Sequence, residues 1–256
     1  MRDFESLFSK SIPNLIPGIS TTSVVFGFKD GKIQVLVSKL KEMDLWMLPT
    51  GYVFKNEDVD NAARRIIKSR VGAKRIFLDQ FYTFGQKDRI TSREENFVLF
   101  SRFIKQKRTR EWFNQRFISI GFISLINIED CELKLDDFSD IVNWAPIDNL
   151  PYLIIDHKKI IESAFKYLKT TSSQLPIGSY VLPEKFTMRD LQTLYEELFK
   201  KKMDRGNFQK RILKLNILNR HEKKMSGNAH RAPFLYSINK TNYSKFKEDN
   251  QDILRW

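Results

Sequence analysis

The sequence predicts an α+β fold in two parts: a domain of strands and packed helices, followed by a smaller unit of two helices and a β-hairpin. Up to about residue 168, short β-branched runs alternate with apolar residues at helical spacing, which predicts the sheet and its helices. Charge divides the chain near the same place: Pro183–Lys247 holds 16 Lys and Arg against 6 Asp and Glu, a net of +10 within the +13 of the whole chain. We therefore expect one domain over residues 1–170, a linker over 171–179 and a second domain over 180–256.

The first part opens with a predicted hairpin. Ser23–Phe28 reads as a strand, Asp30 and Gly31 are residues typical of a hairpin turn, and Lys32–Leu40 alternates apolar and polar residues. The next run, Leu45–Val53, contains a proline and a glycine, so we expect a short strand that leaves a loop. The chain therefore begins with antiparallel strands.

Helices and further strands follow. Val59–Val71 has apolar residues at helical spacing, which predicts a helix packed on the sheet. Ile76–Phe84 and Ile118–Ile126 are apolar and β-branched enough to form strands. Asp156 is placed to cap a last helix from His157 to about Leu168, whose apolar residues fall on one face.

Residues 92–115 form a predicted helical insertion between two of these strands. Ser92 and Glu95 have the spacing of a capping box, and apolar residues follow at helical spacing. The basic run Lys105–Arg110 beside aromatic residues is compatible with nucleic-acid binding. A solvated helix that packs on its own domain or on a second copy is the alternative, and we interpret the insertion as structural.

Composition excludes several classes of site. The single cysteine, Cys131, cannot form an intrachain disulfide, and three scattered histidines have no metal-ligand spacing. The N-terminus has no basic segment followed by an apolar run, and no stretch approaches about 18 uninterrupted apolar residues. We expect a cytoplasmic protein with no membrane span and no metal or other cofactor. The basic second part favours a polyanionic partner, with a solvated basic surface as the alternative.

A motif resembling the Nudix box lies at the predicted helix. The box is usually written G-x5-E-x7-R-E-U-x-E-E-x-G-U, where U is apolar, and Gly51, Glu57, Arg65, Ile67 and Gly72 match it in register. The preceding run from Trp46 to Pro49 is similar to the segment that leads into the box. The resemblance implies a Nudix-like fold for the first domain, a mixed sheet in an α/β/α arrangement.

The departures from the box concern its chemistry. In Nudix hydrolases the three glutamates of the REUxEE stretch share one helix face and hold the divalent cations. Those positions are Ile66, Ser69 and Arg70 in this chain. Glu57 remains, but in the family it largely supports the loop and the helix, and Asp58 with Asp60 does not rebuild the lost face. We therefore expect no catalytic residues, no metal site and no enzyme activity.

A Nudix domain without these carboxylates retains a cleft that can bind a nucleotide or a sugar. Trp46 and Tyr52 flank the loop, and Phe84 and Arg89 lie in a stretch that resembles the family's segment at the pocket mouth. We expect these four residues to contact a small-molecule effector, although aromatic residues at such spacing are more often part of the core.

The second domain has the pattern of a winged helix-turn-helix. Thr187 and Asp190 form a capping box for a first helix, and a second helix is predicted over about Arg205–Leu215. Phe208, Ile212 and Leu215 would form the buried stripe of this helix, with polar residues beside it. A basic hairpin follows. The residues expected to contact DNA are Arg205, Asn207, Gln209, Lys210, Arg211 and Lys214 on the helix and Lys223, Lys224, His230 and Arg231 on the wing.

The whole arrangement resembles the Nudix-related transcriptional regulators of bacteria. The residues that carry this second resemblance are Phe186 to Tyr195, Asp204 to Phe208, and the basic wing that ends in His230 and Arg231. The resemblance covers about Thr22–Tyr243 except the insertion. It implies homodimers that bind operator DNA through their winged helices, and an effector such as ADP-ribose or a free pentose. Asp156 and His157 are also similar to an Asp-His pair of this family.

These expectations combine into one hypothesis: a regulator, expected to be a repressor, that binds double-stranded DNA and a sugar or sugar-nucleotide effector. The loss of all three glutamates inclines the prediction slightly toward a free sugar. The alternatives are a Nudix hydrolase with an atypical metal site and an RNA- or protein-binding adaptor. The missing carboxylates argue against the first, and the polar residues interleaved on the second helix argue against the other.

Overall fold

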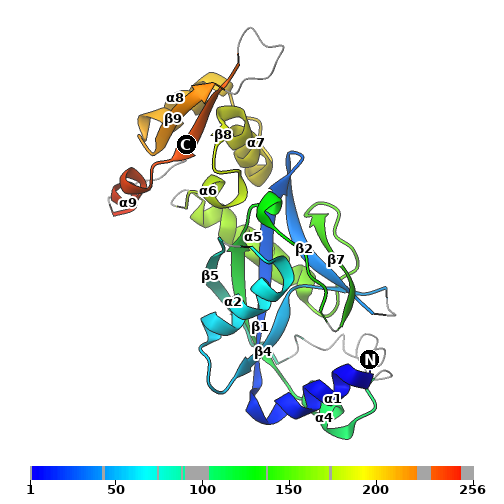
Figure 1. Ribbon diagram of the computed structural model, residues 1–256. Coiled ribbons are helices and arrows are strands. Elements are labelled where there is room, and N and C mark those ends of the chain that lie inside the picture. Colours follow the sequence, from blue (N-terminus) through cyan, green and yellow to red (C-terminus); the bar gives the residue numbers. More distant parts are fainter. Residues whose placement is uncertain are drawn as a thin grey trace.

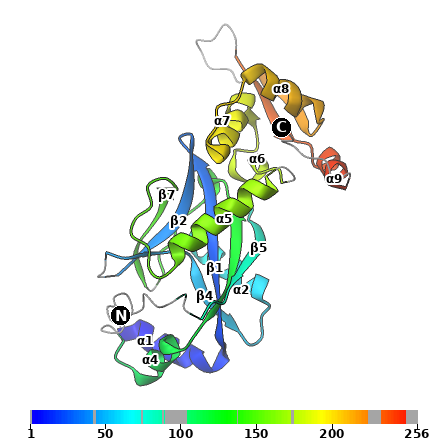
Figure 2. The same cartoon turned by 180° about the vertical axis from the view of Figure 1, so that it is seen from behind.

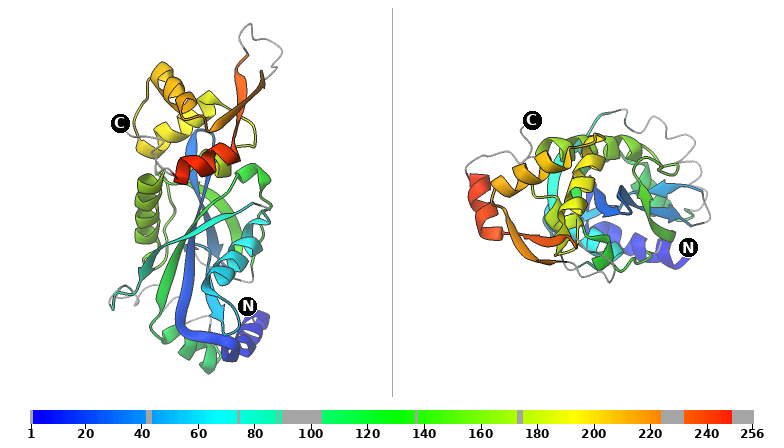
Figure 3. Two further views of the ribbon diagram at one scale, coloured as in Figure 1. Left: turned by 90° about the vertical axis from the view of Figure 1, so that its left-hand side faces the viewer. Right: turned by 90° about the horizontal axis from the view of Figure 1, so that it is seen from above.

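A computed structural model describes residues 2–41, 44–73, 75–87, 89, 104–136, 138–172, 175–223 and 232–248. It contains a large sheet with helices around it and a smaller helical unit with its own short sheet at one end (Figure 1). The view from the side shows that this smaller unit and the N-terminal helix lie at opposite ends of the large sheet (Figure 3).

The large sheet is mixed. Its order is β3-β2-β1-β6-β5, with β4 paired to β1 and β7 paired to β2. β1 and β6 are parallel, and the other pairs are antiparallel. The strands are β1 (Leu15–Lys29), β2 (Lys32–Leu40), β3 (Trp46–Met47), β4 (Thr50–Phe54), β5 (Phe77–Phe84), β6 (Ile118–Leu125) and β7 (Ser139–Pro146).

Two helices cover opposite faces of this sheet. α2 (Val59–Val71) lies in front of the sheet in Figure 1, and α5 (His157–Thr171) lies in front in the reverse view of Figure 2. Side chains alternate between the faces of a strand, so Val24 and Phe26 of β1 share a core with α5, whereas Val25 packs with α2. The predicted α/β/α arrangement with a mixed sheet is confirmed.

The end of the sheet farthest from the smaller unit is closed by α1 (Arg2–Ser11), the short 3-10 helix η1 (Ile12–Asn14) and α4 (Lys107–Asn114) (Figure 1). Phe8 of α1 stacks on Phe113 of α4, with ring centroids 5.1 Å apart. The buried carboxylate of Glu5 accepts a hydrogen bond from the Gln106 amide at 3.3 Å. A second short 3-10 helix, η2 (Ile128–Asp130), follows β6.

The smaller unit is a winged helix domain. α7 is opened by the predicted capping box, in which Thr187 and Asp190 hydrogen-bond each other's backbone, and α8 follows it. A three-stranded antiparallel sheet of order β8-β10-β9 forms the wing. The elements are α6 (Gly178–Val181), β8 (Phe186–Thr187), α7 (Met188–Phe199), α8 (Arg205–Lys214), β9 (Leu218–Lys223), β10 (Phe234–Ile238) and α9 (Lys240–Glu248).

Several predicted elements need correction. The first strand begins at Leu15 instead of Ser23 because its earlier half pairs with β4 and β6. The last helix of the first part continues to Thr171, into the expected linker, and α6 begins at Gly178. The insertion contributes α4, while Ser92, Glu95 and the rest of 90–103 lie outside the described residues. The elements α1, β7 and α9 were not predicted.

A single apolar core joins the two units. It runs from Val24 and Phe26 of β1 through Ile160 of α5 to Leu194 of α7 and Phe208 of α8. Phe77 of β5 and Tyr180 of α6 are neighbours across the junction, with ring centroids 5.0 Å apart. The winged helix therefore packs directly on the end of the large sheet.

Candidate effector site and DNA-binding surface

The loop and helix of the Nudix-like box are held by an ion pair. Arg65 donates from Nε to Glu57 Oε2 and from Nη2 to the Tyr52 carbonyl, both at 3.0 Å. Glu57 also accepts the Phe54 amide at 2.9 Å. Burial alone would raise the pKa of Glu57, but these hydrogen bonds and the charge of Arg65 outweigh it and lower the pKa. Glu57 is thus an ionised support of the loop.

The three positions that carry glutamates in Nudix hydrolases are occupied by residues without a carboxylate. Ile66 is buried on Gly51, where an added Cβ would lie 2.5 Å from Ile66 Cδ1. Ser69 donates to the Ile66 carbonyl at 2.8 Å, and the buried Arg70 pairs with Asp136. Because an alkyl group, a hydroxyl and a guanidinium replace three carboxylates, this helix face does not fit a divalent cation.

Two other features are absent from the described residues. No group of three or more His, Cys, Asp and Glu side chains in this part of the chain is placed to hold a metal ion. Among the described helices, none combines the length and the apolar character needed to cross a bilayer.

Arg89 and Asp156 form a bidentate ion pair at the start of α5. Arg89 Nε donates to Asp156 Oδ2 at 2.8 Å, and Nη2 donates to Oδ1 at 2.9 Å. Nη1 donates to the Phe84 carbonyl at 3.1 Å. Both charged side chains are 8% exposed. The pair ties the chain that follows β5 to the beginning of α5.

This ion pair corrects the role expected for Asp156. The residue precedes α5, as predicted, but its side chain makes no capping hydrogen bond to the helix. Its carboxylate faces Arg89, which is 67 positions away in the sequence. Local spacing indicates a cap, whereas the fold supplies a charged partner that binds the carboxylate more strongly.

His157 lies beside this pair as a neutral, buried imidazole. Burial lowers its pKa to about 4; the Asp156 charge partly offsets that effect, and the Arg89 charge adds to it. Nδ1 accepts the Leu48 amide at 3.0 Å, so the ring carries its proton on Nε2. Ile155, which precedes Asp156, has a φ of 53°, a strained left-handed conformation for a β-branched side chain. Such strain is typical of functional sites.

Buried hydroxyl groups extend from this site across the sheet. Thr22 and Ser119 hydrogen-bond each other at 2.8 Å, and Thr50 donates to Thr22 at 3.3 Å. Ser119 pairs in register with Phe84, whose carbonyl binds Arg89. These hydroxyls were not among the residues expected at the site. Polar residues among the β-branched positions of a central strand would have indicated them.

The four expected effector residues do not all come together. Trp46 lies beside the segment before α5: its amide donates to the Tyr152 carbonyl at 3.0 Å, and its carbonyl accepts the Ile154 amide at 2.9 Å. Phe84 and Arg89 are part of the same region. We define the candidate effector site, called the effector site below, by the residues that surround the start of α5 and the hydroxyl row, namely Thr22, Trp46, Leu48, Thr50, Phe84, Arg89, Ser119, Asp156 and His157.

Tyr52 belongs to a different cluster. Its ring is surrounded by Phe8 of α1, by Trp112 and Phe113 of α4, and by Phe117, with centroids 5.2 to 6.1 Å apart. Burial raises the pKa of the Tyr52 hydroxyl well above its usual range. The described ring contacts of Tyr52 therefore serve to join β4 to α1 and the insertion helix.

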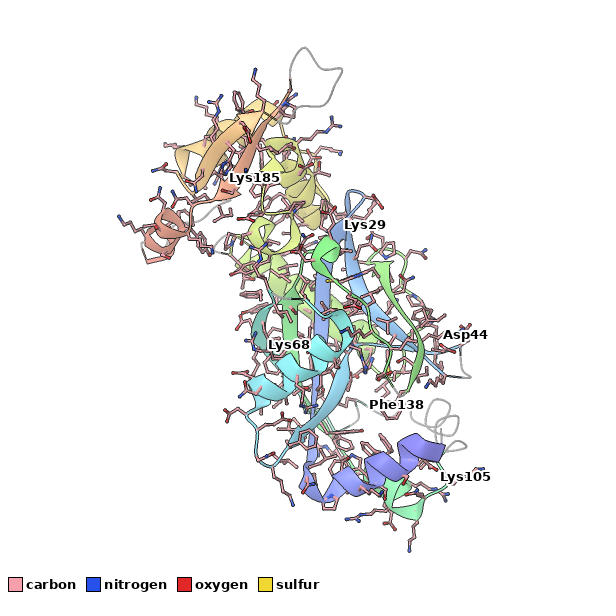
Figure 4. All side chains as sticks on the ribbon, in the orientation of Figure 1. Lys29, Asp44, Lys68, Lys105, Phe138 and Lys185 are labelled. Atoms are coloured by element: carbon pink, nitrogen blue, oxygen red, sulfur yellow. The ribbon has the colours of Figure 1, made fainter. Side chains whose placement is uncertain are left out.

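The second helix of the winged unit presents polar residues on its outer side. Asp204 caps α8 by accepting the Asn207 amide at 2.8 Å, while Phe208 and Ile212 are buried. Tyr195 of α7 lies 6.0 Å from Phe208, ring to ring. Of the residues expected to contact DNA, Gln209 and Arg211 are half-buried, and the exposed ones are Arg205, Asn207, Lys210 and Lys214. Figure 4 shows charged side chains projecting from this unit, which also carries Lys185.

On the wing, two basic side chains lie over an aromatic ring. The Arg220 guanidinium lies 3.4 Å from the centroid of Phe234, and Lys223 Nζ lies 5.4 Å from the same ring. Arg220 was not among the residues expected to contact DNA, although its place on a strand of the basic hairpin was a usable signal. The predicted contacts of Lys224, His230 and Arg231 lie outside the described residues.

Comparison with known proteins gives matches to the winged helix and to most of the chain. Residues 178–238 match the family model of the NrtR DNA-binding winged helix domain. A curated relative from Acinetobacter baylyi, the ADPR responsive transcriptional repressor NtrR, is 22% identical over 211 residues, which are 79% of this chain and 74% of the relative.

Two solved structures share the whole fold. The Shewanella oneidensis NrtR complex with a 27mer DNA is 21% identical, covers 93% of this chain and 98% of its own, and has a TM-score of 0.70. A MutT/nudix family protein from Enterococcus faecalis is 17% identical, covers 93% of both chains and has a TM-score of 0.60. The matches confirm the resemblance to Nudix-related regulators and the predicted fold class.

Proposed function

We propose that this protein is an effector-responsive, non-enzymatic transcriptional repressor that acts as a homodimer. The winged helix would bind operator DNA, and the Nudix-like domain would bind a small molecule at the effector site. The observation that carries the proposal is the match of residues 178–238 to a DNA-binding winged helix family, in a chain whose Nudix-like helix carries Ile66, Ser69 and Arg70. The proposal divides the work between the Nudix-like domain, which ends with α5 at Thr171, and the winged helix domain, which begins with α6 at Gly178.

The effector class we propose is a sugar nucleotide, with ADP-ribose as the first compound to test. The name of the A. baylyi relative supports this choice over a free pentose. A ligand that opens this buried site would meet suitable chemistry: the hydroxyls of Thr22, Thr50 and Ser119 could then exchange hydrogen bonds with ribose hydroxyls, and the His157 Nε2–H could donate to an oxygen acceptor.

Isothermal titration calorimetry and fluorescence anisotropy together test the proposal. We expect ADP-ribose to bind with a Kd below about 1 mM, a free energy of roughly −4 kcal/mol, and to change the affinity for a duplex selected from a random pool by the wild-type protein. Ribose is the matched sugar without the nucleotide, and arabinose is a free pentose of the alternative effector class. Tighter binding of arabinose would overturn the effector class, and failure to enrich any duplex would overturn the regulator function.

We expect no magnesium-dependent diphosphatase activity. The helix face that would bind the cation holds Ile66, Ser69 and Arg70, and none of these supplies a carboxylate. The assay incubates ADP-ribose, NADH and dinucleoside polyphosphates with Mg²⁺ or Mn²⁺. Turnover above about 1 per second, an ordinary enzyme rate, that is lost in Glu57→Gln would show that the chain is a hydrolase.

The recognition helix and the wing should contribute differently to DNA affinity. Asn207→Ala or Arg211→Ala should cost roughly 1–3 kcal/mol on the selected duplex and much less on random DNA, because these side chains are expected to meet base edges. Lys223→Ala should weaken both duplexes alike and reduce the salt slope by about one unit, as expected for a phosphate contact. Anisotropy at several salt concentrations measures both effects. If all three variants changed the two affinities and the salt slope alike, the surface would be a nonspecific basic patch.

A further inference from the structure

Four charged side chains join the two units at the tip of the β1–β2 hairpin. Lys200 Nζ lies 2.5 Å from Asp148 Oδ2 and 2.8 Å from Glu197 Oε1. Lys32 Nζ lies 3.8 Å from Asp148 Oδ2 and 3.7 Å from Glu197 Oε2. Lys32 and Asp148 belong to the Nudix-like domain, whereas Glu197 and Lys200 belong to the end of α7. We name these four residues the junction cluster.

Backbone contacts and burial define the position of each side of the junction cluster. Ile147 donates its amide to the Ile33 carbonyl at 3.0 Å, which holds Asp148 beside the start of β2. Lys200 ends α7 in a left-handed conformation, with φ of 52°. Glu197 is only 9% exposed. Hydrogen bonding to Lys200 and the charges of Lys200 and Lys32 lower the pKa of Asp148 despite its partial burial.

The hairpin tip also lies close to α7 beside the cluster. Gly31 turns the hairpin with φ of 73°, and a Cβ built at this position would be 3.7 Å from Thr193 Cγ2 of α7, an ordinary contact distance. Figure 4, in which Lys29 marks the hairpin tip, shows this tip beside α7. The hairpin tip and the turn after β7 therefore both lie next to α7.

The junction cluster lies between the helices of the DNA-binding unit and the strand that leads from the effector site. Lys200 ends α7, and α8 begins at Arg205 after a short connection, so the orientation of α7 determines where the recognition helix points. On the other side, β1 carries Thr22 of the effector site and leads to the hairpin tip. The cluster thus lies where a movement of the sheet would reach the DNA-binding surface.

We propose that Lys32, Asp148, Glu197 and Lys200 position the winged helix on the Nudix-like domain and transmit the state of the effector site to it. The proposal rests on the proposed function, since it concerns how that effector changes DNA affinity. The pairs are partly exposed, so the cluster is weak enough to be rearranged by a ligand. Allosteric coupling between two sites typically changes affinity by about 5- to 150-fold.

The test compares Asp148→Asn with a matched control, Asp130→Asn. Asp130 forms an exposed 4.0 Å pair with Arg75 inside the Nudix-like domain and does not contact the winged helix in the described residues. We expect Asp148→Asn to speed amide hydrogen exchange in α7 and to reduce the ratio of duplex Kd values with and without ADP-ribose by about 5-fold, within the range of such couplings. Asp148→Glu, which keeps the charge, should restore both, and Asp130→Asn should change neither.

The outcomes separate this proposal from the proposed function. If wild-type protein binds the selected duplex with no response to ADP-ribose, the effector assignment fails, and hydrogen exchange in α7 alone decides whether the cluster positions the winged helix. Equal exchange in Asp148→Asn and wild type would overturn the positioning role. Faster exchange with an unchanged ratio of Kd values, in protein that responds to ADP-ribose, would overturn the transmitting role.

Discussion

Replacing Arg89 with methionine should destabilise the folded protein by about 3–5 kcal/mol, the cost typical of removing one partner from a buried ion pair. Asp156 would lose its counter-charge and both hydrogen bonds from the guanidinium, in a region where only 8% of its side chain is exposed. Urea denaturation followed by circular dichroism measures the change in the free energy of unfolding.

Two further variants make this result specific. Arg75→Met removes the same charge from a pair whose side chains are 55% and 51% exposed, so it should cost less than about 1 kcal/mol. Adding Asp156→Leu to Arg89→Met removes the uncompensated charge and should recover part of the loss. A loss in Arg89→Met no larger than in Arg75→Met would mean that the Arg89–Asp156 pair is not buried in solution.

Replacing Phe208 with alanine should cost about 3–5 kcal/mol and abolish binding to the selected duplex, because Phe208 is one of the two buried residues of α8 and packs this helix on α7. Its side chain is fully buried, and its ring faces Tyr195 at 6.0 Å. The loss of this ring leaves a cavity that α8 cannot fill without moving. Urea denaturation and anisotropy report the stability and the DNA affinity.

Leu213→Ala is the matched control for Phe208→Ala. Leu213 lies on the same helix, but its side chain is 42% exposed, so its loss should change the free energy of unfolding by roughly 0.5 kcal/mol. If Phe208→Ala and Leu213→Ala were equally stable, α8 would not be packed on α7 as the structure shows.

Sequence patterns predicted the elements whose side chains repeat with a clear period. Lys32–Leu40 and Val59–Val71 have the predicted bounds, because the strand alternates apolar residues and the helix places its apolar residues on one face. The capping box of Thr187 also follows from local spacing. By contrast, β7 has a mixed pattern of exposure over Ser139–Pro146, and only pairing with β2 defines it as a strand.

The site was less predictable, because its contacts join residues that are distant in the sequence. Asp156 has the spacing of a helix cap, but its partner Arg89 is brought near only by the return of the chain across the sheet. His157 binds the amide of Leu48, which is 109 positions away. Tyr52 follows the box glycine, and nothing in that position predicts a cluster with α1 and α4.

The shared apolar core makes the sheet and the winged helix one cooperative unit of folding. The same cluster contains Leu168 of α5, Val181 of α6 and Tyr236 of the wing, so neither part can lose its packing without exposing the other. Each part expressed alone would present apolar surface that monomeric proteins avoid. A ligand bound at either end then protects the whole chain: at 100 times its Kd it adds about 2.7 kcal/mol to the stability of both parts together.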